Sequence, residues 1–543
     1  MKRNYWLAAG LLWLSGTAIA DEVATPQTSP AKDAEVTEKK PLFNIFDFQI
    51  DGNTILDDES LERAVYPYLG PDKTVEDVEK ARASLEEAYR KKGYPTVVVS
   101  IPEQNVDAEQ VHLAVLEGSI ESVRVTGSQY HALDTIRDGV PALAEGKVPD
   151  MPKVQEQLNT LSKQSPDRNV TPIFRAGSTP GKMEVELRVK DELPLHGSVE
   201  MNSRQSQHTT YSRLIGSIHY DNLWQKFHSA SFQYQVSPQN SDEVQVWSGT
   251  YVMPTGWADT RLAMYGIGVS SNTQNPLGGA VNVGGLSVVG TGNIFGGRVV
   301  KPLPGSDTFL QSVTGGVDYK TFAQGQNLAN QSLLPQSSIS YLSFMTGYDG
   351  SWHRESSTTT LNLATHFAFR GLVNNAQEFS AKGGASPDFL YLTTDIKHQH
   401  ILPKDFRIQA KANGQISSAT QVPNEQFSAG GPLSVRGYYQ TQLLGDNGIN
   451  LSMELYTPRL VPLEWAEIQN LRLFTFFDWA NVWTYQAIAP TPALAKLAST
   501  GMGMRLLTFK HVIGEIDWSY PLNKEGTVNV GSQRVDFRAV YEF

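Results

Sequence analysis

The last nine residues of the chain alternate between two kinds of side chain. One parity is apolar and ends in Tyr541 and Phe543, while the other carries Asp536, Arg538 and Glu542. Successive side chains of a strand point to opposite faces, so this segment is a ribbon with one apolar and one charged side. A soluble sandwich could use the same pattern. Charges on the inner face and a terminal Tyr-x-Phe are more typical of an outer-membrane barrel, with lipid outside and water inside.

The N-terminus reads as a secretory signal peptide over residues 1–20. Lys2 and Arg3 precede a short apolar run at 5–14, and small residues lead to Ala20, where we expect cleavage. No later stretch offers the roughly 20 apolar residues that a spanning helix needs. Residues 21–40 are polar and without apolar periodicity, which predicts a flexible leader.

Composition narrows the class of protein. The 543 residues include no cysteine, so a secreted chain must be stabilised without disulfides, by a large core or a closed barrel. The absence of cysteine also excludes thiol nucleophiles and cysteine-ligated zinc. A net charge of -11 argues against a nucleic-acid partner, which needs a basic surface.

Two similar modules are predicted between residues 41 and 191. Residues 41–118 read as strand, helix, helix, strand, strand, with a long helix at about 75–92 that Gly93 ends as a C-cap. The same order returns over 119–191. The sequence therefore predicts two small α/β domains in series.

From residue 192 onward the helical period disappears and alternating segments follow one another. In the segment around Phe367, for example, the apolar residues lie on one face of the expected strand, and Asn362 and His366 lie on the opposite face. Inward-facing polar residues across many strands suit a wet lumen and would be unfavourable in a dry core. At roughly 22 residues per strand and connection, residues 192–543 yield about 16 antiparallel strands, wide enough for a channel.

A long Gly-rich connection at about 417–447 is the first motif of interest, because a connection of this length inside a barrel is usually functional. It contains the tetrad Val435, Arg436, Gly437 and Tyr438. We expect Arg436 to point into the pore.

The second motif lies on a strand, where Phe476, Asp478 and Ala480 share the parity that we assign to the lumen. An inner-wall aspartate and an arginine on a re-entrant loop are natural partners, and their bidentate pairing is stronger in a confined pore than on a surface. We therefore predict a latch between Arg436 and Asp478. Tyr438 and Phe476 either pack within this latch or simply fill space.

With these motifs in this order, the chain resembles the transporters of two-partner secretion (TpsB proteins, the haemolysin and haemagglutinin secretion/activation proteins), within the POTRA-domain barrel superfamily. Segments of the first module, such as 51–54 and 101–104, look like the family's first POTRA domain, and the second module looks like its second. The tetrad matches the family's motif on the sixth extracellular loop. Phe476-x-Asp478 matches its barrel-wall partner.

The resemblance implies an outer-membrane translocator with periplasmic POTRA domains. Such a protein recognises an unfolded partner exoprotein and exports it through the barrel by type V secretion. It implies outer-membrane lipid and the barrel assembly machinery as further partners, and a monomer. The terminal Tyr541 and Phe543 are the expected barrel signature.

Two departures from the family pattern stand out. Ala480 occupies a position that is usually glycine, and we expect the latch contact to survive because alanine is small. The leader before residue 41 is short and polar for a plug helix with a long linker, so we expect the sixth loop alone to close the pore.

Other functions fit the sequence less well. We predict no catalytic residues, no cofactor and no metal site, since His208, His219 and His228 show no ligand spacing and no hydrolase motif occurs. An outer-membrane insertase would share the latch but should carry three to five modules. A nutrient receptor or porin is the alternative from another class, and a receptor should contain a globular plug of over a hundred residues.

Overall fold

The computed structural model describes residues 42–543 except 106–108, 208, 258, 272–280, 284–285, 289–290, 325–336, 381–383, 463–464, 466, 486 and 488–492. The predicted signal peptide and leader lie outside the described residues. The chain divides into two compact units, residues 1–117 and residues 118–543. None of the helices in the described part of the chain is both long and apolar enough to cross a membrane.

The first unit is a small α/β domain. Its main sheet has the order β2-β5-β4, with β2 parallel and β4 antiparallel to β5, and β1 pairs separately with β3. The elements are β1(Phe43–Ile45), β2(Asp47–Asp51), α1(Asp58–Val65), η1(Tyr66–Tyr68), β3(Gly70–Lys73), α2(Val75–Lys92), β4(Val98–Ser100) and β5(Gln110–Leu116).

Helix α2 has the bounds that the sequence predicts. Thr74 and Asp77 form a capping box at its start, which satisfies N–H groups that have no partner within the helix. Gly93 ends the helix at φ 103°, a left-handed conformation that glycine adopts without strain. Leu85 and Tyr89 are fully buried beneath the helix, on the face expected from the apolar spacing.

The second module repeats this topology at the start of the second unit. Its sheet has the order β6-β8-β7, again with the first strand parallel and the second antiparallel to the last. The elements are β6(Ser119–Thr126), α3(Leu133–Asp138), η2(Pro141–Leu143), α4(Met151–Gln164), β7(Arg168–Ala176) and β8(Lys182–Asp191). The two α/β modules that the sequence predicts are thus present.

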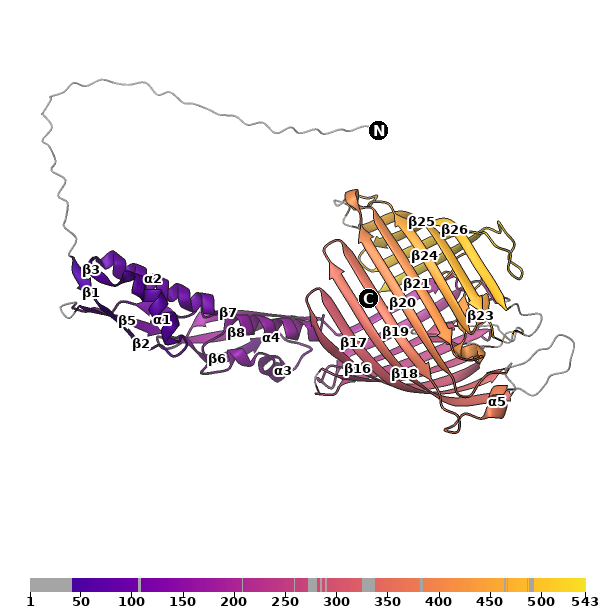
Figure 1. Ribbon diagram of the computed structural model, residues 1–543, viewed down its shortest axis with the longest axis horizontal. Coiled ribbons are helices and arrows are strands. Elements are labelled where there is room, and N and C mark those ends of the chain that lie inside the picture. The colour runs from indigo at the N-terminus through magenta and orange to yellow at the C-terminus, as the bar shows by residue number, and fades with distance from the viewer. Residues whose placement is uncertain are drawn as a thin grey trace, which may run out of the picture. The chain divides into compact units, whose positions relative to one another are not determined.

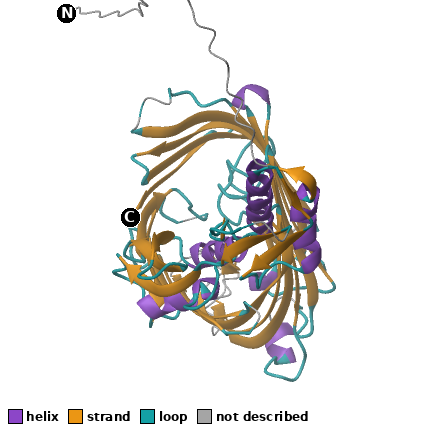
Figure 2. Ribbon diagram, turned by 90° about the vertical axis from the view of Figure 1, so that its left-hand side faces the viewer, coloured by secondary structure: helices purple, strands orange, loops and turns teal. Residues whose placement is uncertain are grey.

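The remaining strands close into a barrel (Figures 1 and 2), which among the described residues has the sixteen antiparallel strands that the segment spacing predicts. They are β9(Leu195–Asn202), β10(Arg213–Leu223), β11(His228–Val236), β12(Val244–Pro254), β13(Arg261–Ser271), β16(Thr291–Ser306), β17(Phe309–Gln324), β18(Ser337–Arg354), β19(Ser357–Phe367), β20(Leu390–Ile401), β21(Arg407–Ser417), β24(Asn447–Tyr456), β25(Ile468–Trp483), β26(Leu494–Thr508), β27(Val512–Pro521) and β28(Arg534–Glu542).

Shorter elements lie in the connections between barrel strands. They are β14(Val281–Val283), β15(Leu286–Val288), α5(Ala376–Ser380), η3(Pro403–Asp405), η4(Pro423–Glu425), β22(Phe427–Ala429) and β23(Leu443–Gly445).

The C-terminal strand closes the barrel by pairing with the first strand, β28 against β9. Phe543 extends this seam: its N–H donates to the Gly197 carbonyl at 3.0 Å, and the Gly197 N–H donates back at 3.0 Å. The Phe543 ring covers Gly197 so closely that a Cβ there would lie 2.3 Å from the ring. A barrel closed in this way has no free strand edge.

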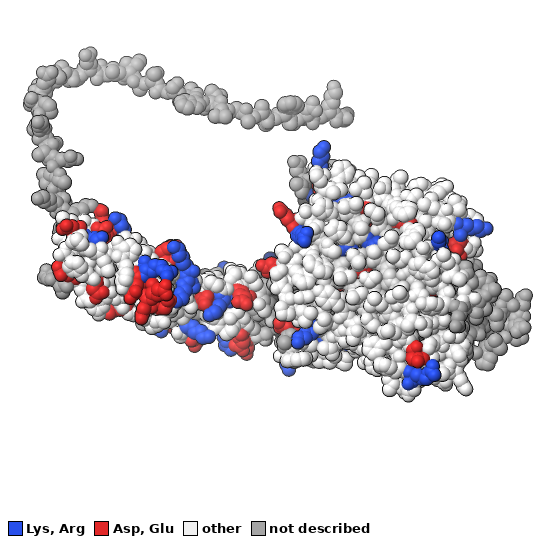
Figure 3. All heavy atoms as spheres, in the orientation of Figure 1, with Lys and Arg blue, Asp and Glu red and all other residues white. Residues whose placement is uncertain are grey.

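The two faces of the barrel wall differ as the alternation predicts. On β25, Leu473 and Phe477 are about half exposed on the outer face, whereas Phe476 and Asp478 on the inner face are buried. Figure 3 shows charged side chains gathered on the two modules, while the visible outer wall of the barrel is almost uncharged. An apolar outer wall around a polar interior is the arrangement of a barrel in lipid.

Candidate functional site: the loop inside the barrel

The candidate site is built around loop L6, which we define as residues 418–446 between β21 and β24. The sequence predicts only an irregular connection here, but the loop contains the short helix η4 and an antiparallel hairpin of β22 and β23. Val435, Arg436 and Tyr438 of this loop are all at least 97% buried. L6 is therefore enclosed by other parts of the protein.

Arg436 contacts Asp478 on the inner wall. Its Nε lies 2.7 Å from Asp478 Oδ2 and its Nη2 lies 2.8 Å from Oδ1, which is a bidentate pair. The Arg436 backbone N–H also donates to Oδ2 at 3.1 Å. A planar guanidinium can form this fork with a carboxylate, and a lysine cannot.

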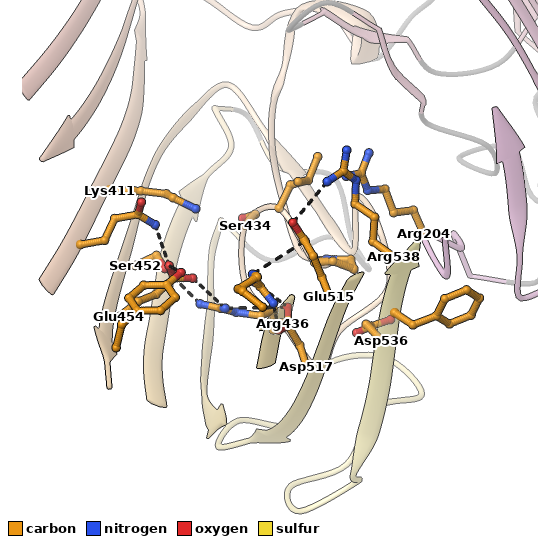
Figure 4. Close-up of a pocket in the computed structure, with 16 residues that line it drawn as sticks. Arg204, Lys411, Ser434, Arg436, Ser452, Glu454, Glu515, Asp517, Asp536 and Arg538 are labelled. Atoms are coloured by element: carbon orange, nitrogen blue, oxygen red, sulfur yellow. Dashed lines mark hydrogen bonds and ion pairs between the residues drawn. The ribbon is translucent and has the colours of Figure 1, made fainter. Parts of the chain in front are cut away.

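Other inner-wall groups complete the surroundings of Arg436 (Figure 4). Its Nη1 lies 2.8 Å from Glu454 Oε1, and Ser452 Oγ donates to Asp478 Oδ1 at 2.7 Å. The guanidinium carbon lies 3.5 Å from the ring centroid of Phe476, in a cation–π contact. Phe476 therefore packs directly on the Arg436 guanidinium.

The other residues of the two motifs pack around this contact. Gly437 has φ 90°, and a Cβ added there would meet Pro521 at 3.0 Å, so the position favours glycine. The Tyr438 hydroxyl lies 3.0 Å from the Ala498 carbonyl and accepts a hydrogen bond from the Asn523 N–H at 3.2 Å. One buried cluster contains Val435, Tyr438 and Ala480 together. The pair of Arg436 and Asp478 is thus formed with an alanine at position 480.

Glu425, in η4 at the beginning of L6, holds a second contact that sequence reasoning missed. Its carboxylate accepts from Lys320 Nζ at 2.5 Å, from the Tyr341 hydroxyl at 2.6 Å and from the Tyr391 hydroxyl at 2.5 Å. The donors belong to β17, β18 and β20, whereas Asp478 belongs to β25. L6 is thus bound to two separate parts of the barrel wall.

A buried apolar cluster surrounds this second contact. It contains Val422 of L6, Phe379 and Phe389 from the connection between β19 and β20, and inner-wall residues such as Phe322 and Tyr341. The sequence predicts that L6 alone closes the pore. Phe379, Ala385 and Phe389, from the described part of the connection between β19 and β20, also pack into it.

Two cavities border the loop. One, of about 310 Å³, is lined by Arg436 and its neighbours Ser452 and Glu454, and also by Arg204, Asp536 and Arg538 (Figure 4). The other, of about 920 Å³, is lined by inner-wall residues including His366 and by Glu425. The lumen is therefore partly filled by loops, and both polar and apolar side chains line the space that remains.

Two families of known proteins resemble parts of the chain. The family of haemolysin secretion/activation proteins ShlB/FhaC/HecB matches residues 181–506, and the ShlB-type POTRA domain matches residues 43–118. The first of these matches covers more than half of the chain.

Curated relatives are distant but extend over most of the sequence. The chain is 24% identical to the outer membrane transporter CdiB of Dickeya dadantii (strain 3937), over 76% of this chain and 72% of that protein. It is 21% identical to the heme/hemopexin transporter protein HuxB of Haemophilus influenzae (strain 86-028NP), over 82% of this chain and 77% of the relative.

Solved structures share the fold. CdiB from Escherichia coli superposes with a TM-score of 0.59 at 19% identity, covering 95% of this chain and 93% of that one. BamA from Haemophilus ducreyi lacking POTRA domains 1–3 also reaches a TM-score of 0.59, at 15% identity over 92% of this chain and all of that one. These likenesses concern the fold, whereas the family match is specific: the chain belongs to the haemolysin secretion/activation proteins, outer-membrane barrel transporters with POTRA domains that export partner proteins.

Proposed function

We propose that this transporter receives its partner exoprotein unfolded in the periplasm, through the two α/β modules, and passes it through the barrel lumen to the cell surface. The observation that carries the proposal is L6, a buried loop bound inside a polar lumen by Arg436 and Asp478. Side-chain contacts and a few backbone hydrogen bonds hold the loop against the wall, and these contacts can break while the surrounding barrel stays closed. We therefore assign Arg436 and Asp478 the role of a pore latch.

The modules support recruitment of an extended chain. Strands β2 and β4 are the edges of the first sheet, and β6 and β7 are the edges of the second. An edge strand presents free backbone N–H and C=O groups that can pair with an extended peptide of almost any sequence. An unfolded exoprotein is such a peptide.

Export needs a driving force at a membrane that has no nucleotide supply. In our proposal the passenger folds outside the cell and is thereby prevented from sliding back. Folding on the outer side makes the process directional, because the free energy of folding is gained only there.

Insertion of the transporter itself belongs to the same proposal. We assign Tyr541 and Phe543, on the seam strand β28 and directly after it, to recognition by the barrel assembly machinery, and we propose that the chain acts as a monomer in outer-membrane lipid. An insertase role has less support, because the described residues hold two modules and the family match is to secretion proteins.

Deletion of the gene tests the proposal. The culture medium of the deletion strain should lack one large secreted protein, which should return when the gene is supplied again. Unchanged secreted proteins would contradict export as the function. Accumulation of misfolded barrel proteins in the envelope would instead indicate an insertase.

A further inference from the structure

Three potential metal ligands lie together at the periplasmic end of the barrel, where β9 begins and β10 ends. His196 on β9 is the direct cross-strand partner of His219 on β10. Asp221 follows two residues later and therefore lies on the same face of β10. One ligand atom from each of the three side chains lies within 4.8 Å of the others.

The two imidazole rings are held side by side. Their centroids are 4.9 Å apart and the rings are stacked, and a carboxylate oxygen of Asp221 lies 3.5 Å from His219 Nε2. His219 also lines the 920 Å³ cavity, so its side chain faces the lumen.

Asp167 of the second α/β module supports His196 from another direction. Its Oδ1 lies 3.0 Å from His196 Nε2, and its side chain is only 9% exposed. Its second oxygen, Oδ2, is buried and has no hydrogen-bond partner within the described residues. A buried carboxylate with an unused oxygen is electrostatically unfavourable unless a cation lies nearby.

This set of groups has the chemistry of a zinc-type site. Neutral imidazole and carboxylate are preferred ligands of Zn²⁺ and related divalent transition-metal ions. A histidine that donates one ring N–H to a carboxylate presents its other nitrogen as a lone pair, as in carboxylate–histidine–metal sites. Ligand atoms about 2.0–2.1 Å from a tetrahedral ion lie about 3.3 Å apart, so the side chains here need to approach by roughly 1.5 Å.

We propose that His196, His219 and Asp221 bind one divalent transition-metal ion of the Zn²⁺ class, and that Asp167 is a positioning residue that orients His196. Because Asp167 belongs to the second module, the bound ion fastens that module to the entrance of the pore. The same two parts already touch through Gln225 Oε1, which accepts from the Ala132 N–H at 2.9 Å.

Linear spacing could not reveal this site. His196 and His219 are separated by the whole β9–β10 connection and meet only through strand register. The competing explanation is a simple ion pair between His196 and Asp167 with no metal, and it makes a different experimental prediction.

The test is metal binding to the full chain, purified in detergent without a histidine tag. Calorimetric titration with Zn²⁺ should show one saturable site per chain. Co²⁺ at the same site should give the visible absorption of a tetrahedral ion. His196→Ala and His219→Ala should each abolish saturable binding, and Asp167→Asn should weaken it by about 10-fold to 100-fold.

Control variants separate this site from other histidines and from misfolding. His398→Ala removes one ring of another stacked histidine pair, with His400, and should leave the stoichiometry and affinity unchanged. Each variant is first shown to migrate as a folded barrel before heating, and His219→Gln provides a second, less drastic change. Absence of saturable binding in the unmodified chain, or equal binding in the His196 and His219 variants, would overturn the proposal and leave the ion pair alone.

Discussion

Arg436 carries its charge into a site that is 97% buried, where an unpaired guanidinium would be strongly unfavourable. Asp478 and Glu454 neutralise it, and the Phe476 ring covers it. Removing one partner of such a buried pair leaves the other charge without a counter-charge, and this destabilises the folded arrangement by about 3–5 kcal/mol. Single substitutions should therefore release the loop.

For Arg436→Ala we predict a loss of secretion of at least about tenfold, with the barrel still assembled, because the change leaves the Asp478 carboxylate buried without its charged partner while the β-ladder is unchanged. Immunoblots of the medium and heat-modifiability of the membrane protein measure the two effects. Arg436→Lys is the matched control: it keeps the charge but not the bidentate fork, and should be intermediate. If the barrel is missing from the membrane, Arg436 acts in assembly rather than as a latch.

For Glu425→Gln we predict a higher and noisier conductance in planar bilayers. The change removes the carboxylate that buried Lys320 contacts directly, so the beginning of L6 should detach from β17. A double variant, Glu425→Gln with Lys320→Met, removes both charges and should recover much of the closed state. Identical conductance in all three proteins would show that this contact does not hold the loop.

His131 in the second module predicts a dependence of stability on pH. Its ring is 5% exposed, and burial lowers its pKa because the charged imidazolium is disfavoured. Near pH 6.5 the unfolded chain therefore binds a proton at His131 that the folded module does not bind. The contribution of His131 to the free energy of unfolding is fully present above about pH 6.5 and decreases as the pH falls through that value, by at most about 1.4 kcal/mol per pH unit.

Hydrogen exchange in the full chain measures this effect. Opening free energies of α3 and β8, corrected for intrinsic rates, should decrease between about pH 7.5 and pH 5.5. The His131→Asn variant, whose amide can still donate to Asp191 as the ring does at 3.2 Å, should show a flatter profile. Equal slopes for both proteins would contradict a neutral buried histidine.

The sequence allowed some of these contacts to be predicted, and the reason lies in parity. Asp478 could be placed on the inner wall because its neighbours on β25 alternate, and Arg436 stood out in a Gly-rich connection. Glu425 gave no such signal, because its partner Lys320 lies 105 residues away and the pairing depends on how the loop enters the lumen. Glu454, a further partner of Arg436, also required the register between β24 and β25.

At the scale of elements, local rules predicted most of the fold. Capping residues and apolar spacing gave the bounds of α2, and two-residue alternation gave the barrel strands. The hairpin of β22 and β23 was not predicted, because each strand has three residues and is formed only through its partner 14 or more residues away. The packing of α5 into the barrel was also not predicted, because a helix of five residues is too short to show a clear apolar periodicity.

The seam between β28 and β9 gives a prediction about assembly. In Gly197→Val the new side chain would collide with the Phe543 ring, so we expect less folded barrel in the membrane. Gly216→Val, on the neighbouring strand β10, is the matched control, since a Cβ there meets nothing within 4 Å. The unboiled mobility shift on gels measures folding. Equal yields of both variants would argue against a role for Phe543 at the seam.

At the scale of the whole molecule, the barrel wall has two environments: the visible outer surface is almost uncharged, whereas the inner surface carries many polar side chains and lines the cavities of the lumen. Leu392 and Thr393, adjacent on β20, illustrate this: Leu392 is 38% exposed on the outer face, and Thr393 lines the 920 Å³ cavity. A polypeptide that crosses the membrane through the barrel must pass Thr393 on the inner face and cannot pass Leu392 on the outer face.

The most direct measurement is photo-crosslinking during export of the partner protein identified from the deletion strain. A photoreactive amino acid is placed at Thr393 or at Leu392, and the partner is stalled in transit by a fused, stably folded domain. We predict a crosslink between transporter and partner from Thr393 and none from Leu392. A partner that is exported normally but never crosslinks to Thr393, or does so equally from Leu392, would contradict passage through the lumen.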